Sequence, residues 1–186
     1  MRNATDKSRA SLIVHRSSFI VSRPGFTLIE ILMVVVILGI MSAVILPQLG
    51  TRDDLKVASA ARTLMADMLY AQSRAVALQK MQYVVFNTAA KKYDIMDSMS
   101  PQNIIANPVT GAQYEQVLGV SPLTNVTFSS VSFDGNTVLA FDALGTPYSY
   151  NAGVLNALNS GSVVLKCNTN QLTVSVQPYS GEIKVQ

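Results

Sequence analysis

Residues 26–46 read FTLIEILMVVVILGIMSAVIL, a run of 21 residues in which Glu30 is the only ionisable side chain. A helix of about 20 apolar residues is long enough to cross the hydrocarbon core of a bilayer. No second apolar run of comparable length occurs in the 186 residues. The sequence therefore predicts a single-pass membrane protein, with a water-soluble remainder from Pro47 onward that is large enough for one modest core.

The charged residues are unevenly distributed around this run. Only 13% of the chain is charged, against roughly 25% in soluble globular proteins. Residues 1–25 contain five basic side chains and one acidic one, whereas residues 26–186 contain nine basic and ten acidic. By the positive-inside rule, the basic arm is expected in the cytoplasm and the chain after residue 46 outside it. Because the basic charge belongs to the arm, nucleic acid is not expected as a partner.

The residue types that most enzymes use are scarce. The sequence contains one cysteine, Cys167, and one histidine, His15, which lies in the basic arm. Without the arm, histidine triads and imidazole zinc sites are excluded, and no phosphate-binding loop or GxSxG elbow occurs. Asp94 and Asp97 are interpreted as a solvated turn at the end of a strand. We therefore expect no enzyme activity, no metal site and no cofactor.

The start of the apolar run differs from that of a secretory signal peptide. Such a peptide has an apolar region of about 7–15 residues with a small-residue cleavage site after it. Here the run is longer, and the small residue, Gly25, comes before it. Glu30 lies one turn into the predicted helix, where a carboxylate costs several kcal/mol unless it is paired. Its partner is either another chain or the headgroup region of the bilayer.

The string GFTLIE at residues 25–30, followed by an unbroken apolar helix, resembles the prepilin processing signature of type IV pilins and type II secretion pseudopilins. The resemblance implies that a prepilin peptidase cuts between Gly25 and Phe26 and methylates the new amine of Phe26. It also implies that Glu30 pairs with the Phe26 amine of a neighbouring subunit. Gly39 and Pro47 lie where family members tolerate local melting of the helix. An equal alternative for Pro47 is that it marks the end of the membrane span with a kink and has no function.

The sequence after Pro47 predicts a second helical stretch to about Met81, an amphipathic continuation of the first helix. Apolar residues recur there at alternating spacings of four and three, which is the pattern of one helix face. They are Val57, Ala61, Leu64, Met68, Ala71, Ala75 and Leu78. Asp53 and Asp54 suit the first turn of this helix if Pro47 interrupts the hydrogen-bond ladder.

Residues 82–186 alternate in short runs rich in Val, Ile, Tyr and Phe, which predicts strands. The predicted strands are 82–86, 92–96, 126–128, 131–133, 137–142, 147–150, 162–166, 171–177 and 182–185. Tight turns are predicted at 134–136 and 179–181, and an irregular, variable loop at 97–116. The sequence thus predicts an α+β fold, a long N-terminal helix packed on an antiparallel sheet domain.

This part of the chain resembles minor pseudopilins and minor pilins of the GspH/FimT type. Three segments carry the resemblance: LMADMLYAQSRAV at 64–76, FDALGT at 141–146, and the end of the chain from residue 174. Two residues depart from the family pattern. Gln72 stands where an arginine is common, and Glu182 follows Ser180-Gly181 where a basic residue is common.

The resulting prediction is a structural subunit with four parts: a leader at 1–25 that is removed, a membrane and filament-core helix at 26–46, its continuation at 47–81, and a periplasmic β-domain at 82–186. The resemblance implies a minor pseudopilin of a type II secretion system, or alternatively a minor pilin of a type IV pilus acting in assembly, motility, adhesion or DNA uptake. The implied partners are other pilin-like subunits, a prepilin peptidase, the inner-membrane assembly platform and membrane lipid. The expected location is the bacterial inner membrane, with the N-terminus cytoplasmic.

Overall fold

The computed structural model describes residues 25–48 and 52–186, except for the side chains of residues 44–48. The chain forms two units, residues 1–48 and residues 49–186. The leader predicted at 1–25 lies outside the described residues apart from Gly25.

The first unit contains helix α1 (Leu28–Gln48). Its large apolar side chains are exposed on every side in the described part, so the helix has no polar face. No helix among the described residues is long and apolar enough to cross a membrane. The membrane span at 26–46 therefore stays a prediction.

The second unit begins with helix α2 (Asp53–Leu78). Six of the seven residues in the predicted apolar stripe are buried, and Leu78 is the exception, with half of its side chain exposed. The helix ends three residues before Met81 because Gln79 takes a left-handed conformation at φ 51°. The amides of Gln79 and Lys80 then bond back to the carbonyls of Val76 and Ala75, which terminates the helix.

The start of α2 agrees with the expectation for Asp53 and Asp54, which occupy its first turn. Asp53 accepts hydrogen bonds from Asn168 at 2.6 Å and from Lys56 at 3.3 Å, so the start of the helix is tied to a distant turn. Arg52 is not helical. The predicted continuity between the two helices falls on residues 49–51, which lie outside the described residues.

Eleven strands follow α2 in the described chain. They are β1 (Gln82–Asn87), β2 (Lys92–Met99), β3 (Gln102–Ile104), β4 (Glu115–Val117), β5 (Val126–Phe133), β6 (Val138–Phe141), β7 (Pro147–Asn151), β8 (Val154–Ala157), β9 (Gly161–Cys167), β10 (Asn170–Val176) and β11 (Ile183–Val185). The seven-stranded sheet has the order β3-β2-β1-β6-β7-β8, with β4 also paired to β2, and the four-stranded sheet has the order β11-β10-β9-β5. All of these pairings are antiparallel.

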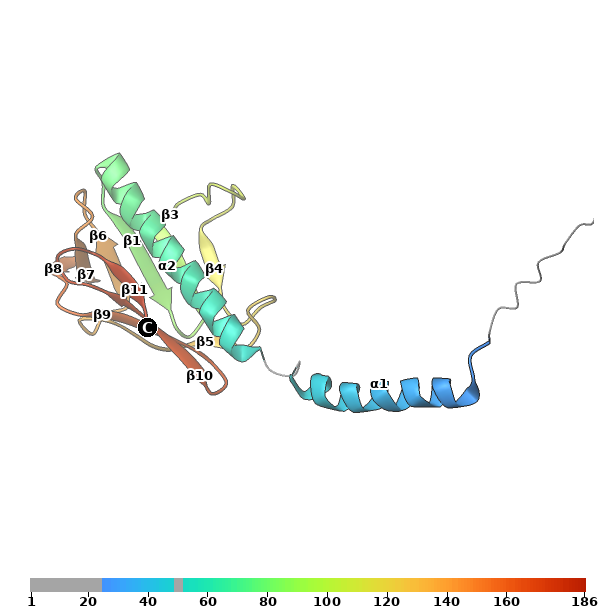
Figure 1. Ribbon diagram of the computed structural model, residues 1–186. Coiled ribbons are helices and arrows are strands. Elements are labelled where there is room, and N and C mark those ends of the chain that lie inside the picture. The colour runs from blue at the N-terminus through green and yellow to red at the C-terminus, as the bar shows by residue number, and fades with distance from the viewer. Residues whose placement is uncertain (1–24, 49–51) are drawn as a thin grey trace, which may run out of the picture. The chain divides into compact units, whose positions relative to one another are not determined.

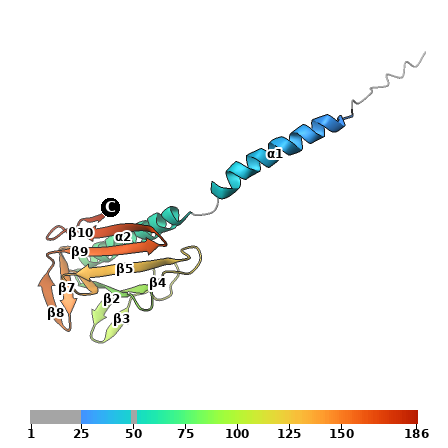
Figure 2. The same cartoon turned by 90° about the horizontal axis from the view of Figure 1, so that it is seen from below.

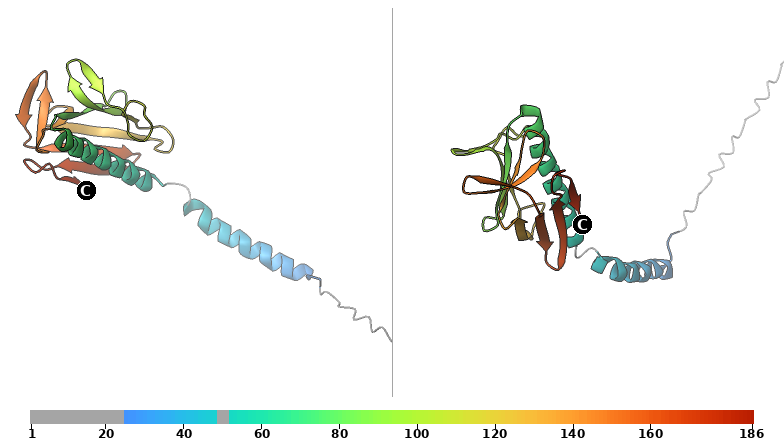
Figure 3. Two further views of the ribbon diagram at one scale, coloured as in Figure 1. Left: turned by 90° about the horizontal axis from the view of Figure 1, so that it is seen from above. Right: turned by 90° about the vertical axis from the view of Figure 1, so that its left-hand side faces the viewer.

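Helix α2 lies along both sheets, contacting β1 and β6 of one and β9, β10 and β11 of the other (Figures 1 and 2). The C-terminal end of the chain, just after β11, lies beside the helix (Figure 3). The six buried residues of the helix stripe belong to one core cluster with Val84 and Phe86 of β1 and Val163 and Leu165 of β9. The fold is α+β, as the sequence predicts, with the helix packed on antiparallel strands. The sequence predicted one sheet, whereas the structure has two sheets that both pack against α2.

Most predicted strands are present, and the exceptions have local causes. The strands predicted at 126–128 and 131–133 form one strand, β5, whose pairing with β9 shifts register between Phe128 and Ser130. The bulge breaks the alternation of side chains, so one strand resembles two in sequence. The irregular loop predicted at 97–116 is wrong in part, because it contains the end of β2, all of β3 and the start of β4. Strand β8 has no predicted counterpart.

The solvated turn predicted at Asp94 and Asp97 is wrong. Asp94 is 6% exposed and lies within β2, opposite Val85 of β1 and Glu115 of β4. Its Oδ2 pairs with Lys92 at 3.6 Å, and Lys92 also bonds to Glu115. Burial raises the pKa of Asp94, and the Lys92 ammonium opposes that rise. Asp94 is buried where β2 pairs with both β1 and β4, which spacing along one strand does not reveal.

Candidate processing and assembly site

The residues at the predicted cleavage junction precede α1 and have no regular secondary structure. Gly25, Phe26 and Thr27 are all exposed, and Phe26 is 78% exposed. No described atom lies within 4 Å of the position where a Cβ on Gly25 would be. Apart from its chain neighbours, the described chain therefore leaves open space around the Cβ position of Gly25.

Thr27 immediately precedes the first helical residue, Leu28. Its hydroxyl accepts a hydrogen bond from the backbone amide of Glu30 at 3.3 Å, and its carbonyl accepts one from the amide of Ile31 at 3.2 Å. These contacts place Thr27 at the N-cap of α1. With Glu30 three residues later, the sequence has the arrangement of a capping box.

Glu30 lies in the first turn of α1 and is exposed. A carboxylate is favourable there because the first-turn amides carry partial positive charge. Among the described residues, its side chain has no ion pair. A partner for Glu30 in another chain therefore stays a prediction.

Gly39 and Pro47 lie in the second half of α1, with Pro47 one residue before its end at Gln48. Glycine in a helix costs about 1 kcal/mol relative to alanine. Close to Gly39, the Ser42 hydroxyl bonds to the carbonyl of Leu38 at 2.6 Å, an interaction that bends helices. Pro47 has no amide to donate to the preceding turn. These features favour local weakness in the helix, and melting during assembly stays a prediction.

A second cluster joins the three segments that carry the resemblance in the β-domain. The side-chain amide of Gln72, on α2, donates to the carbonyl of Gly145 at 2.9 Å and to that of Gly181 at 3.3 Å. Gly145 ends the turn after β6, and Gly181 lies in the turn before β11. In sequence, Gln72 and Glu182, which follows Ser180-Gly181, depart from the family pattern, but only the fold shows that Gln72 contacts Gly181.

Replacement of Gly181 with alanine is expected to destabilise the β-domain by roughly 2 to 4 kcal/mol. Gly181 has φ +66°, and an added Cβ would lie 2.7 Å from the carbonyl oxygen of Gly145 and closer still to the Gln72 amide. Urea unfolding of residues 49–186 measures the change. Gly153→Ala is the matched control, because Gly153 has φ +94° and open space around it; it should cost only the strain of about 1–2 kcal/mol. Equal losses for the two variants would contradict the steric argument.

Asp67, which the helical periodicity places outside the apolar stripe, is buried on α2. Its carboxylate accepts hydrogen bonds from the hydroxyls of Tyr93 at 2.5 Å and Tyr114 at 2.9 Å. Tyr114 also stacks on Tyr70, with ring centroids 5.4 Å apart. Burial raises the pKa of Asp67, and the two tyrosine hydrogen bonds oppose that rise. The cluster anchors the segment between β3 and β4 to the helix.

The raised pKa of Asp67 predicts a pH dependence that an Asp67→Asn variant should lack. The folded state binds the Asp67 proton more tightly than the unfolded state does. Protonation of Asp67 therefore adds its full stabilisation of the fold below the unfolded pKa, near 3.8. That stabilisation is lost as the pH rises through the folded pKa. The unfolding free energy of the wild type, minus that of the variant, should therefore fall as the pH rises above about 4. Urea titrations from pH 3.5 to 7 test this, and a difference that is constant with pH would contradict it.

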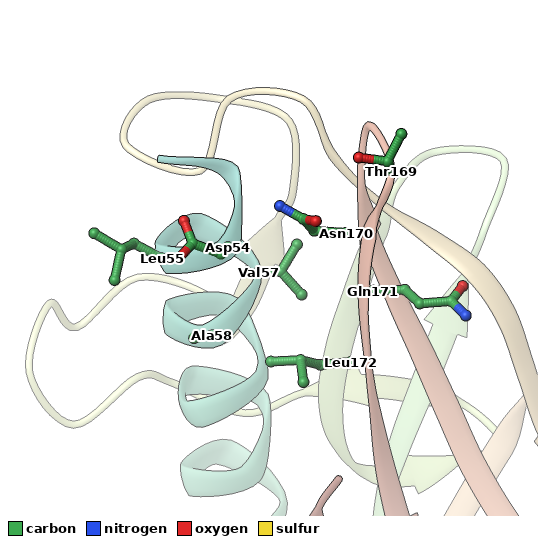
Figure 4. Close-up of a pocket in the computed structure, with 8 residues that line it drawn as sticks. All are labelled: Asp54, Leu55, Val57, Ala58, Thr169, Asn170, Gln171 and Leu172. Carbon is green, nitrogen blue, oxygen red and sulfur yellow. The ribbon is translucent and has the colours of Figure 1, made fainter. Parts of the chain in front are cut away.

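An open groove of about 550 Å³ lies between the start of α2 and the turn from β9 to β10. Figure 4 shows Leu172 of β10 extending toward the helix and Gln171 pointing away from it. The lining has one ionisable side chain, Asp54.

The prokaryotic N-terminal methylation motif matches residues 22–46 of the chain. The match includes Gly25, Phe26 and Glu30, as well as the apolar run. It confirms the resemblance to the prepilin processing signature, and the chain is pilin-like in this segment.

Two solved proteins have similar structures. The type IV minor pilin FimU of Pseudomonas aeruginosa strain PAO1 matches with 17% identity and a TM-score of 0.48, over 72% of this chain and 90% of that chain. The minor pseudopilin EpsH from the type 2 secretion system of Vibrio cholerae matches with 10% identity and a TM-score of 0.47, over 70% of this chain and 96% of that chain. No curated protein matches the chain.

Proposed function

We propose that this chain is a minor pseudopilin of a type II secretion system, a structural subunit of the periplasmic pseudopilus that helps to drive protein export. The methylation motif at residues 22–46 is the observation that carries the pilin-like part of the proposal. In this assignment a prepilin peptidase cleaves between Gly25 and Phe26, and the Phe26 amine is then methylated. The mature chain begins with Phe26.

The mature chain is held in the inner membrane by residues 26–46 before assembly, with the β-domain in the periplasm. The apolar character of α1 on all its described sides supports this assignment, because such a helix is stable only in lipid or among other apolar helices. Five basic residues in the arm 1–25 favour a cytoplasmic N-terminus. The inner-membrane assembly platform then moves the helix from lipid into the filament.

The exposed side of α2 supports packing against neighbouring subunits. Its residues recur at spacings of four and three, the pattern of a helix-packing seam, with apolar or small side chains at six of seven positions. They are Leu55, Ser59, Arg62, Ala66, Leu69, Ser73 and Val76. In the proposed filament this side faces the helices of other pilin-like subunits, and the sheets, which cover the opposite side of α2, face outward.

The test compares a strain lacking the gene with its parent, measuring proteins in the medium and pili on the cell surface in one experiment. The proposal expects secreted enzymes to be lost while pili remain. Complementation with the wild-type gene restores secretion and controls for effects on neighbouring genes. Loss of pili with secretion intact would contradict the proposal and assign the chain to the alternative, a minor pilin of a type IV pilus.

A further inference from the structure

Thr27 determines where α1 begins in the structure. Three hydrogen bonds end on it: the Glu30 amide bonds to its hydroxyl at 3.3 Å and to its carbonyl at 3.1 Å, and the Ile31 amide bonds to the same carbonyl at 3.2 Å. The neighbouring residues offer no other described side-chain cap. An N-cap side chain typically contributes about 1 kcal/mol to the start of a helix.

The cap leaves the junction outside the helix. Gly25 and Phe26 are non-helical, and among the described residues no backbone amide bonds to their carbonyl groups. Within a helix, each carbonyl accepts a hydrogen bond from the amide four residues later. A carbonyl engaged in this way is not free to be bound and attacked by a peptidase.

The sequence permits an earlier helix start if the cap is lost. Pro24 suits the first helical position because its missing amide would be unpaired there in any case. A helix that began at Pro24 would engage the carbonyl of Gly25 with the amide of Ile29. The scissile carbonyl would then be part of the helix.

We propose that Thr27 is a positioning residue for prepilin cleavage: as the N-cap of α1, it keeps the peptide bond between Gly25 and Phe26 in non-helical backbone that a peptidase can bind. The inference rests on the proposed function, in which this bond is the one cleaved. The step is a hydrolysis. Water adds to the carbonyl carbon of Gly25, the bond to the Phe26 nitrogen breaks, and the products are the Gly25 carboxylate and the Phe26 amine.

The test uses the full-length chain in membrane vesicles with a prepilin peptidase and measures cleavage kinetics for three variants. Thr27→Val keeps the branched shape without an acceptor, whereas Thr27→Ser and Thr27→Asn keep an acceptor. We expect kcat/KM for the valine variant to fall about fivefold, mainly through KM, because a smaller fraction of the chain has the junction exposed. The serine and asparagine variants should remain within about twofold of the wild type.

The asparagine variant separates capping from direct recognition of the hydroxyl by the peptidase. If Thr27→Asn is cleaved as slowly as Thr27→Val, the hydroxyl itself is recognised and the inference is overturned. Cleavage of Thr27→Val at the wild-type rate overturns it as well. Failure of the wild-type chain to be cleaved between Gly25 and Phe26 would instead refute the proposed function, and the inference with it.

Discussion

Replacement of Gly25 with alanine is expected to block processing, so that only the precursor is found in membranes. The described chain itself has room for the change, since no atom lies within 4 Å of the added Cβ. The loss is therefore expected to arise in the peptidase, because the resemblance to prepilins implies that cleavage requires a glycine before the cut. We expect the cleavage rate to fall by at least about 100-fold, equivalent to roughly 2.7 kcal/mol of transition-state stabilisation. Mass spectrometry of the membrane-extracted chain measures the ratio of precursor to mature protein.

Gly39→Ala is the matched control for this prediction. Gly39 also has no described atom within 4 Å of its added Cβ, and it lies within α1. Alanine favours a helix there by about 1 kcal/mol, so cleavage should be normal. A Gly25→Ala chain that matures at the wild-type rate would rule out the proposed cleavage position.

Replacement of Glu30 with alanine is expected to leave processing largely intact and to remove the mature chain from filaments. The cap on α1 uses the backbone amide of residue 30, so the start of the helix survives the loss of the side chain. In the proposed filament, however, the charged Phe26 amine of a neighbour would be left without its counter-charge in apolar surroundings, and breaking a buried ion pair is strongly destabilising. We expect at least about a tenfold loss of the chain from purified filaments, measured by immunoblotting.

Glu30→Gln distinguishes this ion pair from the local role that Glu30 has in the capping box. Glutamine serves equally well at the third helical position of a capping box, but it carries no charge. The ion pair therefore predicts that Glu30→Gln is excluded from filaments as fully as Glu30→Ala. Normal incorporation of Glu30→Gln would show that helix capping, and no pairing between subunits, explains the glutamate.

The spacing of apolar residues along the chain predicted those elements that depend on residues close together in sequence. The buried stripe of α2 follows from apolar residues at spacings of four and three, and six of its seven members are buried. The prediction that Leu78 is buried is wrong because Leu78 lies in the last turn, where Gln79 ends the helix. Strand β8 was missed because its residues are exposed at the edge of a sheet and show no alternation of burial.

The candidate site also has one part that the sequence predicted and one part that only the structure shows. The junction at Gly25 and Phe26, together with Glu30, is a continuous motif, so it was visible in the sequence and is matched by the methylation motif. The cap by Thr27 was also encoded locally, in the spacing of Thr27 and Glu30, but its relation to the junction becomes apparent only once the first helical residue is known.

The sequence by itself determined the α+β class, the processing motif and the apolar helix, because each depends on residues that are neighbours along the chain. Tertiary structure alone decided that Asp67 is buried beneath Tyr93 and Tyr114, and that Gln72 joins the turns at Gly145 and Gly181. The partners in these contacts are 26 to 109 residues apart in the chain. No helical or strand period relates positions so far apart, and they meet only because the burial of apolar surface folds both sheets against one helix.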